Sequence, residues 1–373
     1  MTLSGTRLWA IARKEVTQLR RDTRSLVLAF LLPVSLLVLF GYAITWDVND
    51  IKTAVVDQDM SPRSRELIEA FTASGYFTIT EYLNSMDEVD DRLSRGTDQI
   101  VLVIPPDFSA NLGGGDPALL QALVDGSDAN TATIILSYTE AIVTRYSTAI
   151  ALQGQTFEPP LVAESRVWYN EELTSRNMIV PGLVAVIMMI IAAMLTSLTI
   201  AREWERGTME QLAATPVTRI EVVIGKLLPY LAIGLIDVIV CSVMGVWLFD
   251  VPFRGNPALL MILSFFFLTG ALGLGMFIST VAHSQVEATQ LAMIVTFLPA
   301  YLLSGFMFAI DVMPAVLRGI TFLVPARYFL VVTRGIFLKG VGVDVLRVQG
   351  LLMIAFSIVG FLAAVRVFRK ELA

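Results

Sequence analysis

Six stretches of this chain are each long and apolar enough to cross a lipid bilayer as an α-helix. A spanning helix needs about 20 predominantly apolar residues. The six are Leu26–Ile44, Ile179–Ile200, Leu227–Phe249, Ala258–Val281, Ala288–Ile310 and Leu346–Phe368. Only 16% of all residues are charged, whereas soluble domains average about 25%. The chain is therefore predicted to be an α-helical membrane protein with six transmembrane helices.

The basic residues predict how these helices are oriented. Lysine and arginine gather before the first span (Arg7, Arg13, Lys14, Arg20, Arg21, Arg24), between the second and third (Arg202, Arg206, Arg219, Lys226), and in the tail (Arg366, Arg369, Lys370). Short basic loops remain on the cytoplasmic side of a membrane. We therefore expect a multi-pass protein with both termini in the cytoplasm and an even number of spans.

A seventh apolar run, Ile320–Leu338, is interrupted by Pro325, Arg327 and Arg334. A seventh crossing would place the basic tail outside, so we predict a re-entrant segment within residues 311–340. Interrupted helices are tolerated at membrane depth where protein covers their backbone. One observation opposes this scheme, because the external loop Asp311–Arg347 then carries five Lys/Arg.

The segment before the first span, residues 1–25, has a helical pattern. Leu8, Ala12, Val16 and Leu19 recur at helical spacing, with arginine and lysine between them. This pattern predicts an amphipathic helix that lies along the cytoplasmic surface. The alternative is a solvated basic leader whose charge only sets the orientation of the first span.

Residues 47–176, after the first span, have the composition of a soluble domain. They contain 21 Asp/Glu and 8 Lys/Arg. Strands are predicted at IKTAVVDQD, YFTIT, QIVLVIP, LLQALVDG and ESRVWYN, and helices at Ser61–Ser74, Ser85–Arg95 and Ala129–Gln153. Alternating strands and helices predict an inserted α/β domain outside the cytoplasm. Its negative charge is explained by solubility, or alternatively by attraction of cationic substrates.

The motifs of common catalytic sites are missing from the sequence. His283 is the only histidine, which argues against a multi-histidine metal site. The chain contains neither the phosphate-binding motif G-x-x-x-x-G-K-[ST] nor the G-x-S-x-G motif of serine hydrolases. We therefore predict no catalytic residue, no metal site and no cofactor bound by this chain.

One charged segment follows the second apolar stretch directly: AREWERGTMEQLAATPVTR, residues 201–219. Gly207 is expected to break the helix that leaves the membrane. Thr208 and Gln211 have the spacing of a capping box for a new short helix, and Pro216 ends the segment. Such an element either docks on a cytosolic partner or is an ordinary intracellular turn, and the physical pattern favours neither.

The same segment resembles the E-R-G-T-x-E-Q-L-x-x-T-P signature of type-2 ABC exporter permeases. The matching residues are Arg202, Glu203, Glu205, Arg206, Gly207, Thr208, Glu210, Gln211, Leu212, Thr215 and Pro216. LSGFMFAIDVMP and PARYFLVVTRGIFLKG are similar to the outer part of that family's membrane domain, and IPPDFSANL and VDGSDANTA to its subgroup with a large insertion. Trp204 departs from the pattern, since relatives often carry a charged residue there.

The resemblance implies a permease subunit that exports a drug, lipid or other amphipathic substrate. Residues 202–216 would form a coupling helix that meets a cytosolic ATPase subunit, which would bind ATP and Mg. Residues 26–46 would be the first transmembrane helix, and 177–373 the remaining membrane domain with helices 2–6. A second permease, a copy or a paralogue, would complete the exporter in a bacterial inner membrane. A periplasmic adaptor is a further partner to consider, and no nucleic acid is expected.

Three residues are candidates for the translocation pathway: Asp237, Phe306 and Met307. Asp237 lies near the middle of an apolar stretch, where an ionised carboxylate is costly unless it is paired or hydrated. It either faces the pathway or forms a hydrogen bond between helices while protonated. Phe306 and Met307 either line an apolar route or pack in the core. The small residues of GALGLG, residues 270–275, are expected to allow close helix packing.

Two other functional classes remain as alternatives. An ion-coupled secondary transporter would explain Asp237 and the missing ATPase motif, although the sequence has no inverted internal repeat of the kind such transporters often show. A membrane receptor that senses a ligand through its external domain is the other. It would need few of the later spans and a cytosolic signalling domain, which the sequence does not contain.

Overall fold

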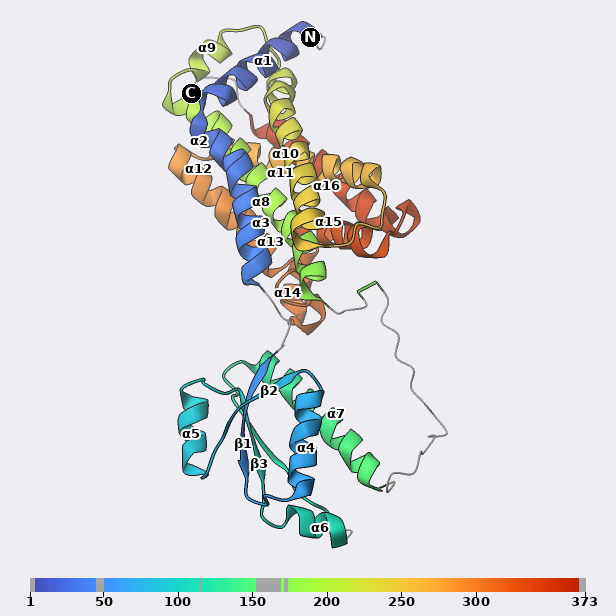
Figure 1. Ribbon diagram of the computed structural model, residues 1–373. Coiled ribbons are helices and arrows are strands. Elements are labelled where there is room, and N and C mark those ends of the chain that lie inside the picture. Colours follow the sequence, from blue (N-terminus) through green and yellow to red (C-terminus); the bar gives the residue numbers. More distant parts are fainter. Residues whose placement is uncertain (1–3, 45–49, 115, 152–168, 171–173, 369–373) are drawn as a thin grey trace. The chain divides into compact units, whose positions relative to one another are not determined.

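The computed structural model describes residues 4–44, 50–114, 116–151, 169–170 and 174–368. The chain divides into two compact units, a helical unit of Met1–Thr45 with Arg166–Ala373 and an α/β unit of Trp46–Ser165 (Figure 1). Because 46–49 and 152–168 lie outside the described residues, the predicted domain boundaries at 47 and 176 stay predictions.

Four helices of the helical unit have the length and composition of membrane spans. They are α8 (Ser175–Glu205), α10 (Arg219–Phe249), α11 (Pro257–Val281) and α16 (Val343–Val367). Most of the apolar part of α8 is buried by the other helices. A helix that is apolar on all sides belongs inside a bundle, and α8 is the central helix of this one.

The two remaining predicted spans are helical but interrupted. The first comprises α2 (Thr23–Leu26), a π-helical turn (Val27–Leu31) and α3 (Leu32–Ala43). The other comprises α12 (Gln285–Ala292), a π-helical turn (Met293–Phe297) and α13 (Leu298–Leu302). Each π turn precedes a proline, Pro33 or Pro299, which lacks the N–H of a regular helix. The predicted span Ala288–Ile310 is also too long, because its helix ends at Leu302 and Gly305 turns the chain with φ +86°.

The interrupted run near the C-terminus is a bent pair of helices. After a 3₁₀ turn (Ile310–Val312), α14 (Ala315–Thr321) meets the segment formed by α15 (Pro325–Arg334) and a π turn (Gly335–Lys339) at 76°. Pro325, predicted only to interrupt the apolar run, begins the second helix. In the part of the chain that is described, four to five helical segments therefore qualify as spans, five if the bent pair counts as one.

Glycines allow the central helices to approach closely. A Cβ added to Gly273 of α11 would lie 2.6 Å from the carbonyl carbon of Gly360 in α16. On the other side of α11, Gly275 lies against Ala193 and Thr196 of α8. The Thr196 hydroxyl donates to the Leu272 carbonyl at 2.9 Å. The small residues of GALGLG therefore pack within the chain.

The α/β unit contains a four-stranded mixed sheet in the order β2-β1-β3-β4. β1 (Ile51–Asp57) is parallel to β2 (Phe77–Tyr82) and β3 (Ile100–Ile104), and β3 is antiparallel to β4 (Gln121–Val124). Its helices are α4 (Pro62–Ala73), α5 (Asp87–Ser94), α6 (Phe108–Gly114) and α7 (Ala129–Ala151). All but α6 were predicted. Of the predicted strand ESRVWYN only Tyr169 and Asn170 are described, and neither is in a strand.

Both faces of this sheet are covered by apolar residues. Phe71 of α4 packs with Ile51 and Val55 on one face, and Val89 of α5 packs with Ala54 and Val56 on the other. Residues that alternate along β1 therefore face opposite layers, as the pleat of a strand requires. The interior strand β3, whose sequence is IVLVI, accordingly reads as a continuous apolar run.

The N-terminal helix α1 (Gly5–Arg21) packs along α10. Its close approach depends on Gly225, where an added Cβ would lie 2.8 Å from the Cβ of Ile11. The predicted apolar face was partly wrong. Val16 is exposed, while the charged Glu15 is buried between Ile11, Ala12 and Leu19. A buried carboxylate at this position requires a partner, which the cluster described below supplies.

Candidate functional site

The charged segment after α8 folds into a turn and a short helix. α8 ends at Glu205, Gly207 adopts φ +65°, and α9 comprises Met209–Ala213. The left-handed conformation of Gly207 is readily adopted only by glycine. The Thr208 backbone N–H donates to the Glu203 carbonyl at 3.0 Å, and its hydroxyl donates to the same oxygen at 3.4 Å. Thr208 is thus tied back to α8.

The capping box that the structure shows lies further along, at the start of α10. The Glu221 N–H donates to the Thr218 hydroxyl, and the Glu221 carboxylate accepts from the Thr218 N–H at 2.7 Å. The same carboxylate accepts from the Ser4 N–H at 2.8 Å. Arg7 donates to the Pro216 carbonyl. The chain that returns from α9 is therefore held by the beginning of α1.

Buried charges join α1, α8 and α10 beneath this turn. Lys226 Nζ lies 2.7 Å from Glu15 Oε1 and 3.0 Å from Glu203 Oε1, and all three side chains are 2% exposed. Lys14 Nζ approaches Glu203 Oε1 at 2.6 Å. Glu15, Glu203 and Lys226 would each be costly to bury alone and are compensated by their partners, whereas Lys14 is 49% exposed. We call Lys14, Glu15, Glu203 and Lys226 the inner charge cluster.

A second set of polar contacts extends from the same turn to Asp22, between α1 and α2, and to α12. Arg202, which is 9% exposed, lies 2.6 Å from the Asp22 carboxylate and donates to the Gln285 side chain at 3.4 Å. Gln285, the first residue of α12, donates through its backbone to Glu205 Oε1 at 2.6 Å. Arg202 and Glu205 therefore connect the end of the central helix to both interrupted spans.

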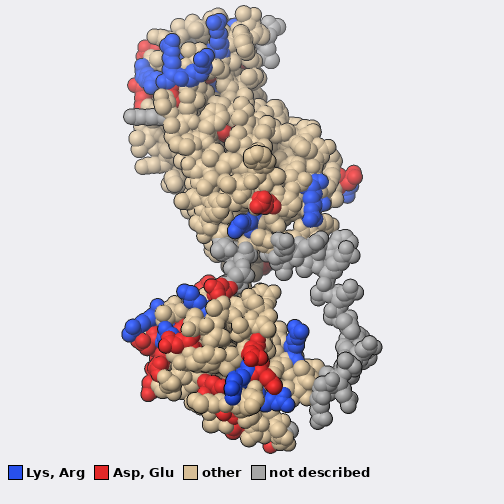
Figure 2. Space-filling view, viewed as in Figure 1, with Lys and Arg blue, Asp and Glu red and all other residues tan. Residues whose placement is uncertain are grey.

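The remaining signature residues face outward. Arg206, Gly207, Glu210, Gln211, Thr215 and Pro216 are exposed, and Trp204 beside them is 41% exposed. We call Arg206, Glu210, Gln211, Thr215 and Pro216 the outer surface. α9 lies with α1 at one end of the helical unit, and α14 lies at the other (Figure 1). Lysine and arginine side chains gather at the α1–α9 end, whereas acidic side chains predominate on the α/β unit (Figure 2).

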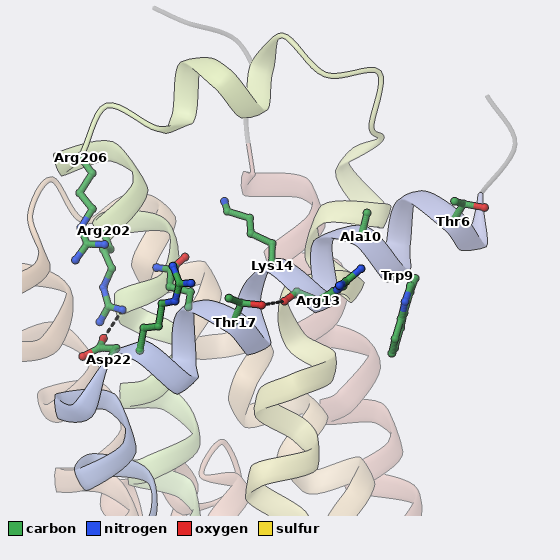
Figure 3. A pocket seen from close by; sticks show the side chains of 11 residues that line it. Thr6, Trp9, Ala10, Arg13, Lys14, Thr17, Asp22, Arg202 and Arg206 are labelled. Atoms are coloured by element: carbon green, nitrogen blue, oxygen red, sulfur yellow. Dashed lines mark hydrogen bonds and ion pairs between the residues drawn. The ribbon is translucent and has the colours of Figure 1, made fainter.

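Beside the contacts between α1 and this turn lie two hollows, each lined by residues of both. The smaller, of about 280 Å³, is lined by Lys14, Gln18, Arg202, Glu203, Arg206, Thr208, Gln211 and Thr215. The larger, of about 820 Å³, extends along α1 from Thr6 to Asp22 and reaches Arg202 and Arg206 (Figure 3). Within the described residues, no three His, Cys, Asp or Glu side chains are placed to hold a metal ion. Charged and amide side chains line both hollows.

The three pathway candidates lie in two places. Asp237 is a buried residue of α10, and its Oδ2 atom has no hydrogen-bond partner among the described residues. Phe306 and Met307 follow α13, where both contact Tyr301. Phe306 is buried against Gly182 of α8, so within one chain it is a packing residue.

Sequence reasoning missed most partners of the signature. Lys226 was counted only as a charge that sets orientation, and Glu15, Asp22 and Gln285 were not singled out. Two signals were available. Lys226 interrupts the apolar pattern of VVIGKLLPYL, and Glu15 lies at helical spacing from Leu8, Ala12 and Leu19. A charge on an otherwise apolar face indicates a buried partner.

Known proteins are similar to this chain along nearly its whole length. A family model described as "ABC-2 family transporter protein" matches residues 24–366. The probable multidrug ABC transporter permease YbhS of Escherichia coli K12 is 38% identical over 358 residues, 95% of each chain. YbhR of the same strain, with the same description, is 31% identical over 91% of this chain and 92% of its own. The linearmycin resistance permease protein LnrN of Bacillus subtilis is 24% identical over 97% of this chain and 99% of its own.

Proposed function

We propose how this chain works from the premise that it belongs to the ABC-2 family of transporter proteins: it is the permease of an exporter, and a separate subunit hydrolyses ATP. In our proposal the outer surface binds that ATPase subunit. When the ATPase subunit moves, the inner charge cluster transmits the movement from the turn to α1 and α10. One observation carries this proposal. At the start of the signature Arg202 and Glu203 are buried, whereas the later residues of the outer surface are exposed.

The chain is a multi-pass membrane protein, and we place the α1–α9 end in the cytoplasm. Supporting this placement, basic side chains gather at that end (Figure 2), as cytoplasmic ends of membrane proteins require. The runs Thr23–Ala43 and Gln285–Leu302 then complete six spans in the inner membrane. The bent pair α14–α15 is a re-entrant segment on the far side, and the α/β unit is outside the cytoplasm.

The outer surface suits a protein partner. α9 presents Glu210 and Gln211, and the following loop presents Thr215 and Pro216, so charged, amide and hydroxyl groups share one exposed patch. Such groups give an interface its specificity through hydrogen bonds at defined positions. The ATPase must bind them more tightly in one nucleotide state than in the other, because a ligand moves a conformational equilibrium only by its differential affinity.

The inner charge cluster is placed to transmit movement of the turn to α1 and α10. Glu203 leads into the turn, Lys226 belongs to α10, and Lys14 and Glu15 belong to α1. Any displacement that separated Glu15, Glu203 and Lys226 would leave buried charges uncompensated. The turn, α1 and α10 consequently move together. Arg202 and Glu205 extend this connection to the first and fifth spans.

Two sets of variants separate docking from transmission. Glu210→Ala with Gln211→Ala removes outer-surface groups and is expected to lower co-purification of the ATPase subunit by about tenfold or more, which corresponds to 1.4 kcal/mol. Glu203→Gln keeps the size of the side chain but removes its charge. It is expected to retain the ATPase subunit while losing substrate-stimulated ATP hydrolysis in proteoliposomes.

The control for this experiment is Glu69→Ala, an exposed carboxylate on α4 of the α/β unit. It is expected to match the native protein in both measurements. If the double variant bound the ATPase subunit as the native chain does, α9 would not be the docking surface. If Glu203→Gln kept full stimulation, the inner cluster would serve folding alone.

The substrate is an amphipathic drug or lipid, and the exporter contains a second permease, which is a paralogue of this chain. The name of LnrN records resistance to linearmycin, and YbhS and YbhR are named as multidrug permeases. The similarity of this chain to both YbhS and YbhR of one strain supports pairing of paralogues. A periplasmic adaptor would meet the α/β unit.

Asp237→Asn tests the role of the buried carboxylate in α10. The amide has the same shape but no charge. In cells that depend on this exporter, it is expected to lower resistance to cationic amphipathic drugs about tenfold, the loss of one modest charge interaction, while resistance to neutral drugs is unchanged. Asp250→Asn is the control, an exposed aspartate at the end of α10. An equal change for both drug classes, or none, would remove Asp237 from the pathway.

A further inference from the structure

Three arginines of α1, Arg13, Arg20 and Arg21, differ from its other basic residues, Arg7 and Lys14, in having no acidic partner among the described residues. Arg7 approaches the Glu221 carboxylate, and Lys14 pairs with Glu203. Among the residues that the structure describes, no carboxylate pairs with Arg13, Arg20 or Arg21, and all three are exposed. Their charge is therefore available for a partner outside the chain.

Two of these arginines alternate with apolar residues along one stripe of the helix. Trp9, Arg13, Val16 and Arg20 follow the spacing i, i+4, i+7 and i+11, which places them on one face. Trp9 is 66% exposed and Val16 is exposed as well. Trp9 points away from α9, whereas Lys14 points toward it (Figure 3). The stripe thus lies beside the face of α1 that carries Lys14, and two of its residues, Trp9 and Arg13, also border the larger hollow.

The stripe forms a groove together with α10. This groove, of about 770 Å³, is lined by Trp9, Ala12, Arg13, Val16, Thr17, Arg20, Arg21, Leu228, Pro229 and Ala232. Arginines line it from α1, and exposed apolar groups of α10 such as Leu228 line the other side. A molecule that fills it must carry negative charge and apolar chains together.

The position of the groove along α10 indicates which molecule meets it. Immediately beyond Lys226 the exposed surface of α10 becomes apolar, so Leu228 and Ala232 lie where a spanning helix enters the membrane. α1 is fixed at that level by its contact with Gly225 and leads directly into Thr23–Ala43. Tryptophan and arginine at such a level sit among lipid headgroups.

We propose that the groove between the Trp9–Arg20 stripe of α1 and Leu228 of α10 binds an anionic phospholipid of the cytoplasmic leaflet. The guanidinium groups of Arg13, Arg20 and Arg21 bind the headgroup phosphates, for which their planar donor geometry is suited. Trp9, Val16 and Leu228 contact the upper parts of the acyl chains. The lipid holds the outer face of α1, whose inner face carries Glu15 of the charge cluster. The orientation rests on the proposed function.

The test measures lipid preference of the full-length permease purified with its ATPase subunit. The complex is placed in nanodiscs of phosphatidylcholine alone or mixed with phosphatidylglycerol, and retained lipid is counted by native mass spectrometry after partial delipidation. The native complex is expected to retain phosphatidylglycerol. Arg13→Gln, Arg20→Gln and Arg21→Gln together are expected to lower its preference roughly a hundredfold, because each arginine contributes separately to binding an anionic surface.

A lysine variant separates a defined site from a basic surface. Arg13→Lys, Arg20→Lys and Arg21→Lys keep the charge, and with it the orientation of the first span, but lose the paired donors of guanidinium. This variant is expected to lose about fivefold or more of the preference. The control replaces Arg63, Arg65 and Arg95 of the α/β unit with glutamine, which removes the same charge elsewhere.

Two outcomes would overturn the proposal. Retention of phosphatidylglycerol by the lysine variant at the native level would indicate attraction to charge alone. An equal loss in the α/β control would show that the preference does not depend on α1. The coupling proposal is judged separately by binding of the ATPase subunit, which these variants are expected to retain. If the native permease bound no ATPase subunit but kept its lipid preference, only the coupling proposal would fail.

Discussion

Lys226→Met is expected to destabilise the helical unit by about 3–5 kcal/mol, the usual cost of removing one partner from a buried ion pair. The reason is geometric. Lys226 is the only cation within 3.0 Å of both Glu15 and Glu203 in the described part of the chain, and its loss leaves Glu15 buried among apolar side chains. Thermal inactivation of the purified permease in detergent, followed by size-exclusion chromatography, measures the change.

A second variant distinguishes lost charge balance from lost packing. Glu15→Gln combined with Lys226→Met removes the orphaned carboxylate while Lys14 still pairs with Glu203. This double variant is expected to recover about 0.5–3 kcal/mol relative to Lys226→Met alone, the range of coupling between contacting residues. Lys52→Met in the α/β unit, an exposed lysine, should change stability little. If the Lys226→Met protein were as stable as the native one, the ion pairs of Lys226 would make no net contribution to stability.

Much of the membrane architecture could be predicted because hydropathy is a local property of the sequence. α11 and α16 lie close to their predicted bounds, whereas α8 and α10 contain their predicted spans but extend beyond them on the α9 side. The interrupted spans were less predictable, since a π turn before Pro33 or Pro299 depends on how a particular helix accommodates a missing N–H. The end of α13 at Leu302 was missed for a similar reason, because Gly305 turns the chain within a sequence that remains apolar.

The short helix after Gly207 was predicted from the sequence, but the contacts that surround it were not. The signature indicated which residues lie in the segment 202–216, and the spacing indicated a short helix after Gly207. Which of them are buried depends on α1, whose residues are nearly 190 positions away from Glu203 in the chain. Glu203 is buried and Glu210 is exposed. This difference depends on tertiary contacts, which a local sequence pattern does not reveal.

Gly273→Leu is expected to prevent assembly of the helical unit itself. α11 and α16 meet at Gly273 and Gly360 so closely that an added Cβ at either glycine would lie 2.6 Å from backbone atoms of the other helix. Backbone cannot move aside as a flexible side chain can. Even Gly273→Ala should cost about 1–3 kcal/mol through overpacking, and leucine should leave no monodisperse permease after detergent extraction. Gly319→Leu in α14, where an added Cβ meets nothing within 4 Å, is the matched control.

The same experiment decides between two roles for these small residues. In membranes, small residues let helices approach each other both within a chain and between chains. A seam between two permeases would respond to Gly273→Leu by separating into folded single chains that still bind the ATPase subunit. The backbone contact with Gly360 lies inside one chain, so we expect aggregation or loss of the protein. Folded, separated permeases would contradict this expectation and assign Gly273 to the dimer contact.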